Sequence, residues 1–114
     1  YCPVPGGGQP DAASMIAAIE ACTNTKVEAV VGKPSAHMAQ AILGLVDALP
    51  ANCIMIGDRL ETDVLMGLNA GMAGALTLTG ATSEADLAGS PIKPTYVINQ
   101  LADLLPDNKP GKLD

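Results

Sequence analysis

Two carboxylates that flank one strand-to-helix corner carry the clearest chemical signal in this sequence. Asp58 follows the apolar residues 53–56 and Gly57, where a buried strand is expected to end. Asp63 comes shortly afterwards, in or near the first turn of the helix that the next apolar residues predict. Carboxylate oxygens are ligands that Mg²⁺ takes, usually with water and phosphate completing its octahedron. The two residues therefore predict a magnesium site at the carboxyl end of a strand, where open α/β sheets bind their ligands.

The elements needed to position this corner alternate along the chain. Short apolar runs, typical of strands, separate segments whose apolar residues recur at helical spacing. The predicted strands are residues 27–31, 52–56, 73–79 and 95–98, and the predicted helices are residues 11–23, 35–49, 62–70, 84–87 and 101–105. This alternation predicts an α/β fold, a partial Rossmann-like parallel sheet of about four strands with helices on both faces.

A parallel sheet brings the corners that follow its strands to one edge. Lys33, in the corner after the first predicted strand, and Thr79, after the third, are then expected near Asp58 and Asp63. The same residue types are also compatible with purely structural roles. Asp58 could equally be a helix cap, Asp63 a favourable charge near a helix N-terminus, and Lys33 a solvated surface lysine.

Composition narrows the class of protein and of partner. At 114 residues, 48% of them apolar, the chain is expected to form one globular domain. A net charge of −6 argues against nucleic acids and anionic membranes as partners, but not against a small phosphorylated substrate. Three widely spaced cysteines favour reduced thiols in a cytoplasmic protein. The sequence contains no apolar run of membrane-spanning length and nothing typical of a signal peptide.

Two short motifs carry a family resemblance. The run Gly57-Asp58-Arg59-Leu60-Glu61-Thr62-Asp63, with Gly32-Lys33-Pro34-Ser35 upstream, resembles the fourth and third motifs of the haloacid dehalogenase (HAD) superfamily. Within it, the match is to the NagD/4-nitrophenylphosphatase branch and runs from about residue 2 to residue 106. The resemblance implies hydrolysis of a small phosphomonoester with Mg²⁺ as cofactor.

The resemblance also implies a role for each candidate residue. Asp58 is expected to hold Mg²⁺, with Asp63 as a second metal-site carboxylate that acts directly or through water. Lys33 is the expected catalytic and phosphate-binding residue, because its ammonium can neutralise the phosphoryl group. The family's chemistry runs through a covalent aspartyl-phosphate, which needs an attacking carboxylate in an Asp-x-Asp motif. No Asp-x-Asp occurs in these 114 residues.

We therefore interpret the chain as the C-terminal part of a HAD-type phosphatase core that is inactive by itself. Residues 1–10 are expected to be a linker from a cap domain, residues 11–106 the core portion, and residues 107–114 a flexible tail. Without a neighbouring strand, residues 52–56 would form an open apolar edge, which predicts self-association or pairing with another chain there. The alternatives are a non-catalytic α/β interaction module, and an active enzyme assembled from two chains.

Overall fold

The computed structural model describes residues 1–105, so the predicted tail at residues 107–114 lies outside the described residues. The chain divides into two units, Tyr1–Val30 and Val31–Asp114, and each is described by itself. No helix among the described residues is both long enough and apolar enough to cross a bilayer.

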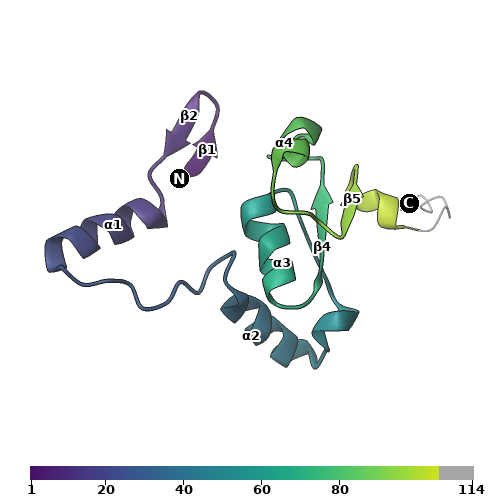
Figure 1. The fold of residues 1–114 in the computed structure, drawn as a ribbon, viewed down its shortest axis with the longest axis horizontal. Helices are drawn as coiled ribbons and strands as arrows, with labels where there is room; N and C mark the ends of the chain where they lie inside the picture. Colours follow the sequence, from purple (N-terminus) through teal and green to yellow (C-terminus); the bar gives the residue numbers. More distant parts are fainter. Residues whose placement is uncertain (106–114) are drawn as a thin grey trace, which may run out of the picture. The chain divides into compact units, whose positions relative to one another are not determined.

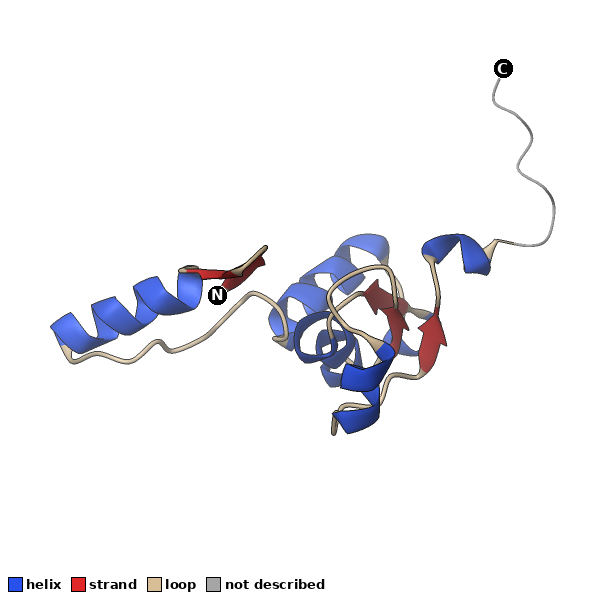
Figure 2. Cartoon of the chain, turned by 90° about the horizontal axis from the view of Figure 1, so that it is seen from above, coloured by secondary structure: helices blue, strands red, loops and turns tan. Residues whose placement is uncertain are grey.

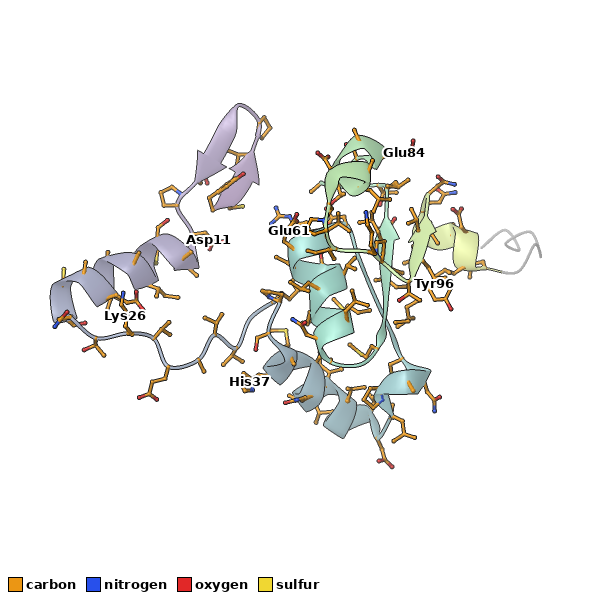
Figure 3. The ribbon with its side chains drawn as sticks, in the orientation of Figure 1. Asp11, Lys26, His37, Glu61, Glu84 and Tyr96 are labelled. Atoms are coloured by element: carbon orange, nitrogen blue, oxygen red, sulfur yellow. The ribbon has the colours of Figure 1, made fainter. Side chains whose placement is uncertain are left out.

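The first unit is a hairpin followed by a helix (Figure 1). Strands β1 (Cys2–Val4) and β2 (Gly7–Gln9) pair antiparallel in the segment where a linker is predicted; its role as a linker stays a prediction. Helix α1 (Ala12–Thr23) confirms the helix predicted at residues 11–23. Asp11, labelled in Figure 3, caps it by accepting a hydrogen bond of 2.7 Å from the backbone N–H of Ala12.

The strand predicted at residues 27–31 is wrong. The backbone N–H of Val27 donates to Glu20 Oε1 at 2.8 Å, and Lys26 Nζ lies 3.0 Å from Glu20 Oε2. The Val27 amide and then the Lys26 ammonium lower the pKa of Glu20. Val30 is exposed and, like its neighbours, belongs to no strand. Valine favours a strand only where a partner strand completes the ladder, and here a carboxylate takes the first amide of the run instead.

The second unit contains a parallel sheet of three strands in the order β3–β4–β5. Figure 1 labels two of them, β4 and β5. The strands are β3 (Ile54–Gly57), β4 (Ala73–Thr77) and β5 (Tyr96–Ile98). Ile54 pairs with Ala73 and Ala75 with Tyr96, and both ladders are parallel. The predicted parallel α/β fold is confirmed, with three strands in this sheet because residues 27–31 do not join it. Within the described residues, β3 has a neighbour on one side only.

Helical segments alternate with the strands of this unit along the chain, and Figure 2 draws them in blue. They are α2 (Ala36–Val46), the 3₁₀ turn η1 (Pro50–Asn52), the π-helical turn η2 (Leu60–Val64), α3 (Leu65–Asn69), α4 (Glu84–Gly89) and the 3₁₀ turn η3 (Leu101–Leu104). All of them except the segment at residues 50–52, where no helix is predicted, overlap predicted helices. The backbone N–H of Val64 bonds to the carbonyl of Arg59 at 3.1 Å, five residues back, which is the bond that defines a π turn. Turn η2 runs directly into α3.

The core of this unit is small and aliphatic. Leu60, Val64 and Leu76 are almost fully buried, and Leu87 and Ile92 pack against them. Turn η2 therefore buries two of the three central side chains, and strand β4 supplies the third. The residues that form the core begin immediately after Asp58, so packing fixes the corner that carries the candidate site.

Helix α2 is buried on a face other than the one that carries most of its large apolar residues. Its buried residues are Ala39 and Leu43, and it contacts α3. The side chains used to predict the helix remain exposed: Met38, Ile42, Leu45 and Leu49. The alanine allows close approach of the two helices, and spacing alone does not tell which of two apolar stripes is buried.

Candidate functional site

Asp58 is held by the loop that follows the neighbouring strand. It comes directly after β3, and its Oδ2 accepts a hydrogen bond of 2.8 Å from the backbone N–H of Ala81. Its carbonyl oxygen accepts a second bond, of 3.1 Å, from the backbone N–H of Thr82. The corners after β3 and β4 therefore lie side by side, as the parallel sheet predicts. Among the described residues, Asp58 Oδ1 has no hydrogen-bond partner.

Asp63 lies at the end of turn η2 and is buried, with 7% of its side chain exposed. Its Oδ1 lies 2.6 Å from Lys33 Nζ. Its Oδ2 accepts hydrogen bonds from the backbone N–H of Arg59 at 3.3 Å and from the hydroxyl of Thr62 at 3.5 Å. Both oxygens are thus engaged with groups of this chain. Figure 3 labels Glu61 on the same turn.

Gly57 leaves the space that Asp63 fills. A Cβ atom built on Gly57 would lie 2.6 Å from Asp63 Oδ2 and would overlap its Cβ and Cγ atoms. No such contact is tolerated between heavy atoms, so any larger residue would displace the buried carboxylate. The glycine before Asp58 is therefore required by the position of Asp63.

Lys33 reaches Asp63 from the corner before α2. The backbone N–H of Ser35 bonds to the carbonyl of Gly32 at 3.0 Å, and Ser35 then caps α2. The Lys33–Pro34 peptide bond is cis, and the Pro34 carbonyl accepts a bond of 3.2 Å from Asn69. The Lys33 side chain is 46% exposed. An ammonium has three N–H donors, and only one is directed at Asp63, so the group can also contact an anion from solvent.

Hydrogen bonds and packing link three of the predicted site residues, whereas the side-chain contact of the fourth is with another threonine. Lys33 and Asp63 form an ion pair, and Asp58 is adjacent to the glycine that packs on Asp63. Thr79 instead has its hydroxyl 3.1 Å from that of Thr77. Sequence reasoning missed the contacts of Gly80 and Ala81 with Asp58. The glycine after Thr79, at the same sheet edge, was the only signal for them.

The available oxygen atoms fit a Mg²⁺ ion whose ligands are mostly water and phosphate oxygens. Across residues 1–105, no group of three or more His, Cys, Asp or Glu side chains gathers that could hold a metal. Mg²⁺ is commonly bound by one or two carboxylates together with substrate phosphate. Asp58, with one oxygen fixed and the other unbonded, provides such a carboxylate. Lys33, half exposed and paired with Asp63, provides a positive charge for the phosphate.

Comparison with known proteins gives consistent matches. The profile of the family described as HAD-hydrolase-like matches residues 30–104. Dihydroxyacetone phosphatase from Corynebacterium glutamicum is 38% identical over 102 residues, which cover 90% of this chain and 37% of that protein.

Solved structures match equally well. The 4-nitrophenylphosphatase from Thermotoga maritima is 41% identical with a TM-score of 0.84, over 90% of this chain and 40% of that chain. NagD from Escherichia coli K-12 is 32% identical with a TM-score of 0.74, over 80% of this chain and 36% of that chain. The chain thus spans well under half the length of the relatives that it matches.

Proposed function

This chain belongs to the HAD-hydrolase-like family, in its NagD-like branch, and we propose that it supplies the metal-binding and phosphate-binding part of a Mg²⁺-dependent phosphatase. The observation that carries the proposal is the ion pair at the strand-to-helix corner. Buried Asp63 holds Lys33 there. Asp58, in the same corner, has one carboxylate oxygen with no partner among the described residues. The names of two relatives, a dihydroxyacetone phosphatase and a 4-nitrophenylphosphatase, support small phosphomonoesters as the substrate class.

Each residue then has one task. Asp58 would hold Mg²⁺ with the carboxylate oxygen that does not accept the bond from the Ala81 amide. Bound Mg²⁺ would neutralise phosphate charge. Lys33 binds a phosphate oxygen with the N–H groups that it does not donate to Asp63. Asp63 keeps that ammonium in place, and because both of its oxygens are engaged we assign its part in the metal site to a contact through water.

The attacking group has no candidate in this sequence. No Asp-x-Asp occurs in it, and metal plus lysine cannot replace a nucleophile. We therefore expect the 114-residue chain to leave 4-nitrophenyl phosphate unhydrolysed. Robust Mg²⁺-dependent turnover would contradict this part of the proposal. Turnover that appears only on mixing with a chain that carries the motif would favour assembly from two chains.

A Mg²⁺ titration tests the metal assignment directly. We expect the backbone amide signals of Asp58 and Ala81 to shift as Mg²⁺ is added at millimolar concentration, because the ion binds the carboxylate between them. Asp58→Asn should abolish the shift, since it removes the charge. Asp47→Asn is the matched control: it makes the same charge change at an exposed residue whose left-handed backbone suits asparagine. Absence of any shift near Asp58 would favour the non-catalytic interaction module.

We also propose pairing of the chain with another strand along the open side of β3. Ile54 is 43% exposed on this strand, and apolar edge strands attract other strands. We expect light scattering after size exclusion to show association that rises with concentration and is lost in Ile54→Lys. Val97→Lys, at the other end of the strand order, is the control. Loss of association in the control alone would place the contact on β5.

A cytoplasmic location is part of the same proposal. Cys22 and Cys53 are free thiols, as expected in a reducing compartment.

A further inference from the structure

Three consecutive residues after β4 contact Asp58, and the loop that they form has no role of its own in the assignments above. Gly80 lies against the side chain, Ala81 donates to Oδ2, and Thr82 donates to the backbone carbonyl of the same residue. We propose that this loop, residues 80–82, fixes the orientation of the Asp58 carboxylate, with Gly80 as a positioning residue that leaves Oδ1 for the ligand. The inference rests on the proposed metal role of Asp58.

The two hydrogen bonds act on both ends of one residue. The bond of 2.8 Å from Ala81 fixes one carboxylate oxygen, and the bond of 3.1 Å from Thr82 fixes the main chain. With the backbone and one oxygen both held, rotation about the side-chain bonds would break the bond to Ala81. A hydrogen bond from an amide to a carboxylate is stronger than one between neutral groups. The second oxygen therefore has a defined direction before any ligand binds.

Gly80 makes this arrangement sterically possible. A Cβ built on Gly80 would lie 2.5 Å from Asp58 Cβ and 2.6 Å from Cγ, and it would overlap Oδ2. The Asp58 side chain cannot move away without losing the bond to Ala81. Only glycine lets the loop lie this close to the carboxylate.

The loop is itself anchored, so it can act as a support. Thr82 is buried. Ser83 begins α4 with a capping box, in which its hydroxyl accepts a bond of 3.3 Å from the backbone N–H of Asp86. Asp86 Oδ2 in turn accepts bonds from the Ser83 hydroxyl at 2.6 Å and from the Ser83 backbone N–H at 2.9 Å. The two bonds to Oδ2 lower the pKa of Asp86. Leu87 of α4 packs on the core. The support for Asp58 thus extends from the loop through α4 to the core.

Gly80→Ala tests the inference, and Gly89→Ala is its control because a Cβ there meets no atom within 4 Å. We expect exchange of the Ala81 amide hydrogen to become about tenfold faster in Gly80→Ala, because the bond to Asp58 is lost. It should stay unchanged in Gly89→Ala. This measurement needs no metal, so it decides the inference even if the native chain fails to bind Mg²⁺. Unchanged Ala81 exchange in a folded Gly80→Ala chain would overturn it.

The Mg²⁺ titration adds a readout that a merely structural role would not change. If the native chain binds Mg²⁺, we expect about tenfold weaker affinity in Gly80→Ala, as for other residues that orient a metal ligand. Equal affinity would overturn the positioning role. Absence of binding by the native chain would instead refute the metal role proposed for Asp58. If Gly80→Ala does not fold, Asp58→Ala takes its place, because it removes the hydrogen-bond acceptor without a steric clash. Slow exchange of the Ala81 amide hydrogen in Asp58→Ala would overturn the inference.

Discussion

Replacing Lys33 with methionine should lower the free energy of unfolding by about 2 kcal/mol, because it leaves the buried Asp63 carboxylate without its cation. Removing one partner of a fully buried ion pair costs about 3–5 kcal/mol. The expected loss is smaller here because Lys33 is half exposed, and water screens its side of the pair. Methionine keeps most of the side-chain length, so the change tests charge more than packing. Unfolding in urea measures the loss.

A second ion pair among the described residues provides a matched control. Lys26 Nζ lies 3.0 Å from Glu20, but the lysine side chain is 85% exposed. Lys26→Met should therefore change stability by less than about 0.5 kcal/mol. Adding Asp63→Asn to Lys33→Met should recover part of the loss, because the amide needs no cation. If Lys33→Met and Lys26→Met lowered the free energy of unfolding equally, the burial of Asp63 would not be what makes its ion pair stabilising.

Replacing Leu76 with alanine should cost about 3 kcal/mol of stability. Leu76 has no exposed surface, lies on the middle strand β4, and contacts the side chains that η2 buries. The cavity would open in a core of only a few residues, where little surrounding structure can move to fill it. Chemical unfolding followed by circular dichroism measures the change.

Leu45 serves as the control for this substitution. It is the same residue type on α2, with 87% of its surface exposed. Leu45→Ala should change stability by less than about 0.5 kcal/mol. A loss below about 1 kcal/mol for Leu76→Ala would mean that the small core is not the main source of stability.

The sequence predicted the helices and the parallel sheet well, because local signals and packing agree there. Asp11, Ser35 and Ser83 each cap the helix predicted to begin beside them. The segment at residues 27–31 failed because strand formation depends on a partner that the segment's own residues do not specify. The buried face of α2 could not be predicted from spacing, because two apolar stripes compete and the one that contains Ala39 is buried.

Only some of the contacts of the candidate site residues could be predicted from the sequence. The rule that strand ends share one edge placed the loop after β4 beside Asp58. It does not account for Lys33, which follows a loop rather than a strand in the structure and reaches Asp63 from the segment before α2. The engagement of both Asp63 oxygens could not be foreseen, because it depends on the path of the π turn. The close approach of Gly80 depends likewise on backbone geometry that no residue pattern encodes.

The wide turn η2 constrains how this region can vary in length. The turn holds one more residue per hydrogen-bonded loop than an α-helix, and α3 continues from it without a break. Deleting a single residue there would rotate all later α3 side chains by about 100° about the helix axis. Met66, now buried, would then point in a new direction, and Asp63 would lose its register with Lys33. We therefore expect this segment to tolerate single substitutions more readily than the deletion of one residue.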